Sequence, residues 1–135
     1  MRRTDQRRAA VFVTYQHEVT SRPLEELLDQ QTDERGRPAT AFTRELAEGV
    51  VAHQAELDGL IERHSVGWPL DRIAPLERSI MRVALYEMLH REDIPAEVAI
   101  DEAVETAKRY CGADAPGFVN GILGAALREG TVVRP

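Results

Sequence analysis

The residues best suited to binding chemistry are arginines at the start of the chain. Four of them fall within the first eight residues, opposed by Asp5 alone: Arg2, Arg3, Arg7 and Arg8. Guanidinium groups bind phosphate in bidentate geometry, and free N–H groups at the start of a helix also favour anions. The chain as a whole has a net charge of −6. A basic tip on an acidic chain predicts a local polyanion site, whereas the alternative is the solvated start of a helix.

Side chains that could perform catalysis are dispersed along the sequence. The segment from His53 to Glu56 lacks the His-Glu-x-x-His arrangement of zinc hydrolases. Cys111 is the only cysteine and falls near the predicted C-terminal end of a helix, where a thiolate is disfavoured, so we expect a small core residue. No glycine-rich phosphate loop is present. The sequence therefore predicts no catalytic residue, no metal site and no cofactor, and we expect a non-enzymatic protein.

Helical spacing of apolar residues at the N-terminus predicts the element that carries the arginines. Thr4 is suited to be the N-cap of this helix, with Asp5 at the positive end of its dipole. Four residues recur at intervals of three or four and are predicted to face the core: Phe12, Tyr15, Gln16 and Val19.

The same periodicity continues to the end of the chain. It predicts a short helix with Pro23 in its first turn, one long helix over residues 42–61 with Gly59 as an interruption, and a helix over residues 75–90. A further helix follows Pro95 and has Cys111 in its last turn, and a last helix runs from an Asp114 cap to Gly130. The helix over residues 75–90 has apolar residues on nearly every face, so we expect it to be central. No segment alternates with a period of two. The predicted fold class is therefore all-α, a compact bundle of six to seven helices.

Length and composition indicate a small globular protein. A chain of 135 residues with 43% hydrophobic residues is expected to form a single helical domain, residues 1–135, with residues 130–135 as a flexible tail. No apolar run approaches the ~20 residues of a membrane span. No apolar segment of a signal peptide follows the first residues, and one cysteine cannot form an internal disulfide. We expect a cytoplasmic protein.

Three motifs in the second half of the chain resemble the NusB antitermination family. The family pattern runs R-I-A-x-Y-E with a following I/V-P, then V-A-I-N-E-A-V, then F-V-N-G-V/I-L. The corresponding segments span about residues 71–127 in the same order and spacing: Arg82–Glu87 with Ile94-Pro95, Val98–Val104, and Phe118–Leu123. The first helix matches more loosely. Its departures from the family pattern are Asp5, Phe12 and Thr14.

The resemblance implies a function as well as a fold. NusB-type proteins pair with the ribosomal protein NusE and bind the single-stranded boxA element of nascent RNA. They act with other Nus factors on the transcription elongation complex, notably in ribosomal RNA operons. A similar helical module precedes the catalytic domain of certain ribosomal RNA cytosine methyltransferases, so a detached domain of such an enzyme is one alternative. A self-associating protein-binding module, since some members form homodimers, is another.

The resemblance also assigns site residues. Besides the basic tip, Phe118 and Asn120 match the RNA-facing end of the last helix, where an aromatic ring stacks on a base and an amide reads base edges. Asp114 matches a position beside that surface, where a carboxylate caps the helix and repels phosphate. Glu77 and Tyr15 match positions used toward NusE. The alternatives are core packing for Phe118 and Tyr15, bracing of the adjacent loop for Asn120, and a solvated face for Glu77.

Overall fold

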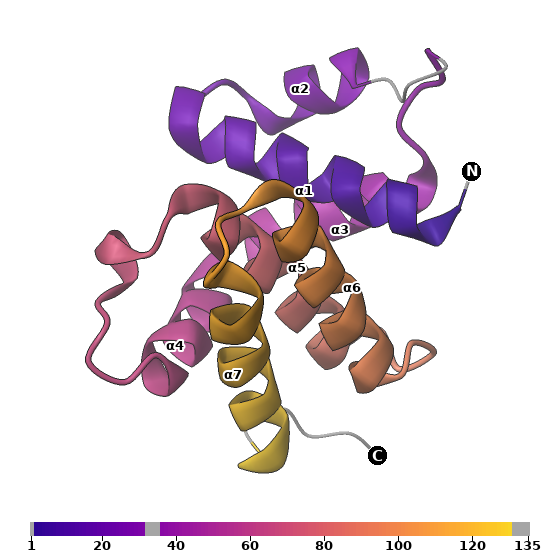
Figure 1. Cartoon of the computed structure of the whole chain (residues 1–135). Helices are drawn as coiled ribbons and strands as arrows, with labels where there is room; N and C mark the ends of the chain where they lie inside the picture. Colours follow the sequence, from indigo (N-terminus) through magenta and orange to yellow (C-terminus); the bar gives the residue numbers. More distant parts are fainter. Residues whose placement is uncertain (1, 32–35, 131–135) are drawn as a thin grey trace.

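The computed structural model describes residues 2–31 and 36–130, and within these it forms seven α-helices and one 3-10 helix (Figure 1). The predicted all-α bundle of six to seven helices is confirmed. Gly130, the first residue of the predicted tail, follows the last helix and has a φ of +72°. The rest of the tail lies outside the described residues. The elements are α1 (Arg3–Thr20), α2 (Leu24–Gln30), α3 (Ala41–Ala52), α4 (Gln54–His64), η1 (Leu70–Arg72), α5 (Pro75–His90), α6 (Ala96–Tyr110) and α7 (Ala115–Arg128).

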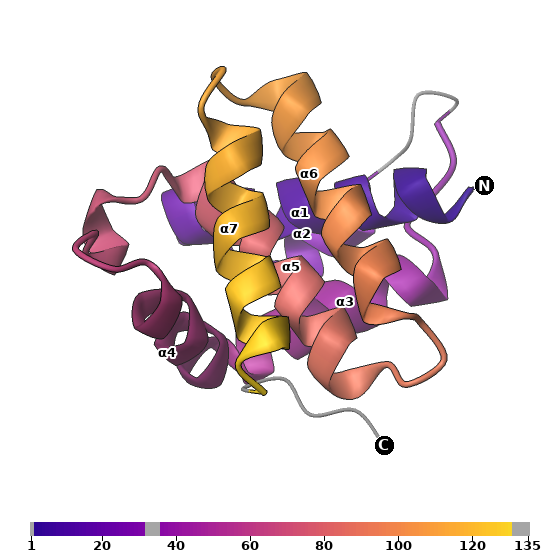
Figure 2. The same ribbon diagram turned by 60° about the horizontal axis from the view of Figure 1, so that its bottom comes forward.

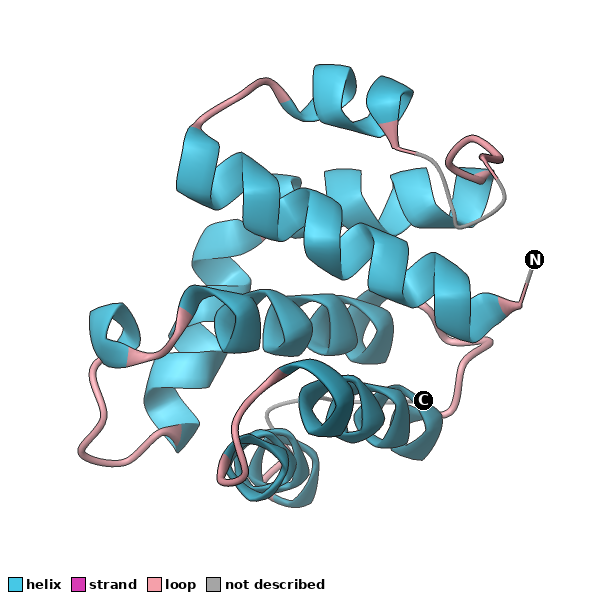
Figure 3. Ribbon diagram, turned by 45° about the horizontal axis from the view of Figure 1, so that its top comes forward, coloured by secondary structure: helices cyan, strands magenta, loops and turns pink. Residues whose placement is uncertain are grey.

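Helix α5 is the centre of the bundle. Every residue from Ser79 to Met88 is buried, because α1, α3, α4, α6 and α7 all pack against this helix. Figure 3 shows α1 on one side of α5 and the α6–α7 pair on the other, and Figure 2 shows α6 and α7 side by side. Pro75 occupies the first helical position, where its missing N–H group leaves no hydrogen bond unmade. The predicted central helix is therefore confirmed.

Helix α1 differs from the prediction in its cap and in its buried face. Arg2 is the N-cap, while Thr4 lies inside the helix and donates its hydroxyl to Glu102 at 2.9 Å. The predicted face is wrong as well, since Gln16 is exposed and Val19 is 54% exposed. The buried face differs from the predicted one because three of its residues, Gln6, Arg7 and Thr14, are polar and have hydrogen-bond partners. The buried residues of α1 are Gln6, Arg7, Ala10, Val11, Val13 and Thr14.

The predicted long helix over residues 42–61 is two helices. The chain breaks at His53, whose φ of −111° and ψ of 18° lie between α3 and α4. Gly59 does not interrupt anything and lies inside α4. The His53 side chain packs at this break, where its Nδ1 lies 3.0 Å from the carbonyl oxygen of Gly49 and its ring centroid lies 4.3 Å from that of His90. The break directs α4 toward α7, whereas α3 packs against α1.

Two glycines in these helices give opposite predictions for substitution by alanine. At Gly49 an added Cβ would lie 2.2 Å from ring carbons of Tyr86, which is buried, so Gly49→Ala is expected to destabilise by about 1–3 kcal/mol. At Gly59 nothing lies within 4 Å, so Gly59→Ala is expected to stabilise by about 0.5–1 kcal/mol. Urea unfolding of both variants measures the two signs. Equal effects of the two substitutions would contradict the packing of Tyr86 on α3.

A network of ion pairs fixes the start of α5 and the turn before it. Arg82 is nearly buried, and its Nε donates to Asp58 at 2.7 Å while its Nη1 donates to Glu18 at 2.6 Å. Arg78 donates to the same Glu18 at 2.5 Å and to the carbonyl oxygen of Ile73 at 3.0 Å. The network therefore joins α1, α4, α5 and the segment that leaves η1. Ile73, whose carbonyl oxygen accepts from Arg78, also lines a pocket at the start of α5.

Candidate nucleic-acid interface

A pocket of about 430 Å³ lies where the start of α5 meets the turn between α6 and α7. It brings together three of the predicted site residues, namely Glu77 from α5, Asp114 from the turn and Phe118 from the first turn of α7. The sequence separates Glu77 from the other two by more than thirty positions, so the bundle is what assembles the group. The other lining residues are Trp68, Arg72, Ile73, Ala74, Gly112, Ala113 and Ala115.

The aromatic part of the pocket consists of Phe118 and Trp68. Phe118 is half-buried, so part of its side chain packs against the core and part is exposed to solvent. Trp68 is 53% exposed, and the two ring centroids lie 6.4 Å apart at 64°. The sequence analysis did not assign Trp68 to the site. The available signal was a lone tryptophan between Gly67 and Pro69, in a loop that offers no helix face for so large a side chain.

The polar residues of α7 are accessible. Asp114 occupies the N-cap position, as predicted, but its side chain makes no capping hydrogen bond and is exposed. Its carboxylate is therefore free to act on a ligand near the pocket. Asn120 is also exposed, two residues beyond Phe118. An exposed amide needs no internal partner, which removes the reason to regard Asn120 as a brace for the neighbouring loop.

Glu77 is a half-buried carboxylate that lacks a cation. Burial raises the pKa of Glu77, and in the part of the chain that the structure describes no basic side chain forms an ion pair with it. A half-buried carboxylate without a cation is stabilised when another molecule supplies a basic side chain next to it. Burial and the charge of Glu77 also raise the pKa of the Cys111 thiol, which is half-buried and packs against the edge of the core rather than lying within it as predicted.

The remaining predicted partner residue, Tyr15, is not part of the pocket lining. It is half-buried on α1, so part of its side chain is accessible to solvent. Its assignment toward a partner stays a prediction.

The outer residues of the basic tip are exposed but distant from this pocket. Arg2 has a side chain that is 83% exposed, with its Nε 3.5 Å from Asp5. The guanidinium of Arg3 lies 3.8 Å from the ring centroid of Phe42, at the start of α3. Figures 1 and 3 show the start of α1 and the η1 turn at opposite ends of the molecule. The tip and the pocket therefore form two separate parts of the surface.

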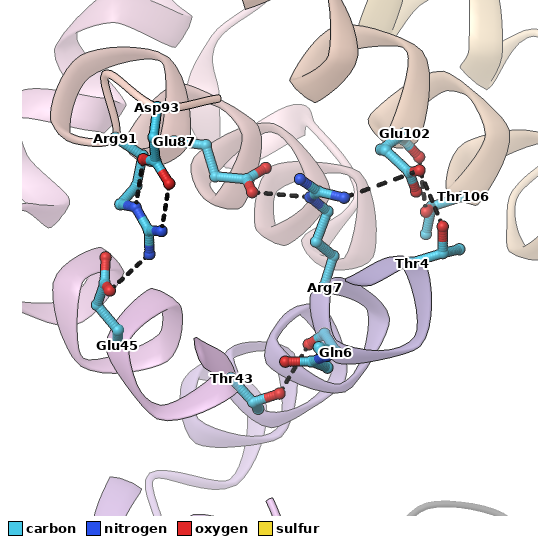
Figure 4. Close-up of polar contacts among 10 residues, drawn as sticks. All are labelled: Thr4, Gln6, Arg7, Thr43, Glu45, Glu87, Arg91, Asp93, Glu102 and Thr106. Atoms are coloured by element: carbon cyan, nitrogen blue, oxygen red, sulfur yellow. Dashed lines mark hydrogen bonds and ion pairs between the residues drawn. The ribbon is translucent and has the colours of Figure 1, made fainter. Parts of the chain in front are cut away.

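Arg7 occupies a different environment from the other arginines of the tip. It is 8% exposed, and its Nε donates to the buried Glu87 of α5 at 2.7 Å (Figure 4). Its Nη1 also lies 3.8 Å from Glu102 of α6. The geometry argues against the predicted contact of Arg7 with RNA, because its charge is already compensated inside the protein. Arg8, by contrast, is half-buried beside Tyr110, 5.9 Å from that ring centroid.

Known proteins are similar to this chain in both sequence and fold. The sequence pattern that defines the NusB family matches residues 4–128. The chain belongs to the NusB family. The resemblance seen in the sequence motifs is thereby confirmed. The transcription antitermination protein NusB of Rubrobacter xylanophilus is 41% identical over 126 residues, which cover 93% of this chain and 90% of the relative. That of Bacillus subtilis is 41% identical over 123 residues, covering 91% and 92%.

Solved structures of the family agree with the fold. The structure of T. maritima NusB has a TM-score of 0.82 and 36% sequence identity, and the match covers 96% of this chain and 92% of that one. A structure described as the antitermination factors NusB and NusE in complex with double-stranded RNA has a TM-score of 0.79 and covers 94% and 96%. At 23% identity, the latter supports the fold alone.

Within residues 2–31 and 36–130, no three or more histidine, cysteine, aspartate or glutamate side chains are placed to hold a metal ion together. None of the helices described is both long enough and apolar enough to cross a membrane.

Proposed function

We propose that the protein is a transcription antitermination factor of the cytoplasm. In this proposal, residues 1–135 act as one non-enzymatic domain that binds boxA-type single-stranded RNA together with NusE, in elongation complexes with other Nus factors. The observation that carries the proposal is the pocket in which the exposed Trp68 and the half-buried Phe118 adjoin the carboxylates of Glu77 and Asp114. Family membership and relatives matched over nine-tenths of their length support antitermination over a detached methyltransferase domain.

The RNA contacts in this proposal come from the aromatic pair and from exposed polar groups. Phe118 and Trp68 present ring faces on which unpaired bases stack, and the Asn120 amide is accessible to base edges. Arg2 and Arg3 supply positive charge for phosphates at the far end of α1. Asp114 opposes this attraction, since an uncompensated carboxylate beside the rings repels the RNA backbone.

The partner contact in this proposal centres on Glu77. Its half-buried carboxylate has no cation in the described chain, so a basic side chain of NusE placed over the pocket would compensate it. Tyr15 contributes ring area and a hydroxyl from α1. RNA and protein would thus meet along adjacent edges of one surface.

Substitutions at Phe118 test the RNA contact. Phe118→Leu retains apolar volume in the half-buried site but removes the aromatic face, and Phe118→Ala removes both. We expect both variants to lose about 1–3 kcal/mol of boxA affinity, the contribution of one stacked base, because neither offers a ring. Only Phe118→Ala is expected to melt at a clearly lower temperature. Fluorescence anisotropy with labelled RNA, and thermal melting followed by circular dichroism, measure the two quantities. Parent-like affinity of Phe118→Leu would refute the stacking role.

A further inference from the structure

An exposed aromatic side chain outside the pocket ends helix α6. Tyr110 is 41% exposed, although one edge of its ring contacts Phe12 of α1, with centroids 4.9 Å apart and planes at 89°. This edge-to-face contact fixes the orientation of the ring and leaves part of it open to solvent. A tyrosine ring held in this manner is a preformed surface for another flat group.

The guanidinium groups of two arginines lie over that ring. The guanidinium carbon of Arg8 lies 5.9 Å from the centroid and that of Arg109 lies 5.5 Å from it. In the described part of the chain neither arginine has a carboxylate within 4.0 Å, whereas Arg7 and Arg91 each have one at 2.7 Å. The Nε of Arg8 is buried and has no hydrogen-bond acceptor. The cluster of Arg8, Arg109 and Tyr110 therefore carries two positive charges that form no ion pair with a carboxylate of the described residues.

The position of this cluster links the two parts of the surface described above. Tyr110 precedes Gly112, Ala113 and Asp114, which line the Phe118 pocket, so the cluster adjoins the pocket along the chain. Arg8 lies on α1 between the exposed tip and Phe12. A strand of nucleotides that reached both the Phe118 pocket and the basic tip would pass the cluster.

We propose that Tyr110, Arg8 and Arg109 form a second nucleotide-binding position for single-stranded RNA. One base stacks on the open part of the Tyr110 ring, and the two guanidinium groups hold the flanking phosphates. The proposal rests on the proposed RNA-binding function and extends it from Arg8 of the basic tip to Tyr110 and Arg109, which the NusB motifs do not include. Single-stranded RNA fits better than an acidic peptide because the site combines an exposed aromatic ring with two guanidinium groups within 6 Å of it, and a nucleotide offers both a flat base and a phosphate.

The test uses the full chain, NusE and a labelled boxA-type oligoribonucleotide. Tyr110→Ala is expected to weaken binding at least about fivefold, the lower end of the loss of one stacked base, and Tyr110→Phe is expected to bind as the parent does. Arg109→Gln is expected to reduce the slope of log affinity against log salt by about 0.7, one phosphate contact on a single strand. Lys108→Gln is the matched control, since Lys108 is exposed and paired with Glu105 at 3.6 Å.

The outcomes separate this inference from the proposed function. If Tyr110→Ala and Arg109→Gln bind RNA as the parent does while Phe118→Leu binds weakly, the second position is refuted and the proposed function stands. If the parent itself does not bind RNA, both are refuted. A lower melting temperature of Tyr110→Ala with unchanged RNA affinity would make the cluster a brace between α1 and α6. Loss of NusE binding in the absence of RNA would make it a protein-binding surface. Either result overturns the proposal.

Discussion

Replacing Arg7 with methionine is expected to lower the free energy of unfolding by about 3–5 kcal/mol. The substitution keeps most of the side-chain volume but leaves the carboxylate of Glu87, which is 1% exposed, without its cation at 2.7 Å. An unpaired buried charge costs far more than a lost surface ion pair. The matched control is Arg2→Met, because Arg2 is exposed and its contact with Asp5 at 3.5 Å contributes little. A similar loss of stability in both variants would contradict the burial of the Arg7–Glu87 pair.

The pH dependence of the same variant gives a second readout. Burial raises the pKa of Glu87 while Arg7 lowers it, so removing Arg7 raises this pKa further. A carboxyl group whose folded-state pKa exceeds the unfolded value binds its proton more tightly in the folded state. Stability then increases as the pH falls from the folded-state pKa toward the ordinary glutamate value. The deficit of Arg7→Met should accordingly shrink under mildly acidic conditions, and Arg7→Met combined with Glu87→Gln should be more stable than Arg7→Met alone at neutral pH.

Reversal of the charge at Glu77 should have the largest effect on the affinity for NusE. Glu77→Lys places a cation in the half-buried site that is proposed to receive a basic side chain of NusE, so NusE affinity should fall by about 2–5 kcal/mol. Glu97→Lys is the control, because this substitution makes the same change of charge at an exposed residue in the first turn of α6. Isothermal titration calorimetry compares the two. Equal NusE affinity of Glu77→Lys and the parent would exclude this role for Glu77.

Much of the fold could be predicted because apolar residues recur at helical spacing wherever a helix is packed on one side. The central position of α5 was evident for the same reason, since its apolar residues cover nearly all faces. The buried face of α1 was not evident, because Gln6 and Arg7 point inward toward acceptors such as Glu87, eighty positions away in the sequence. Periodicity counts apolar residues only, so a helix face that includes buried polar groups is assigned incorrectly. The break at His53 carries no proline or glycine and left no local signal.

The candidate site could be predicted to a similar extent. The structure places Glu77, Asp114 and Phe118 around one pocket, a grouping that the sequence did not predict, because the resemblance assigned Glu77 toward NusE and the other two toward RNA. Trp68 and Tyr110 were not assigned, since one lies in a loop and the other at the end of a helix, where spacing does not define a face. Their proximity to Phe118 and to Arg8 is a property of the tertiary structure.

The binding titration of the parent protein tests the central claim most directly. Purified protein, with and without NusE, is titrated against labelled boxA-type RNA and against a scrambled RNA of the same length, at one fixed salt concentration. The account predicts saturable binding of the boxA-type RNA that is tightened by NusE and clearly stronger than binding of the scrambled RNA. Equal affinity for both RNAs, or self-association of the protein with no RNA binding in the presence of NusE, would contradict it.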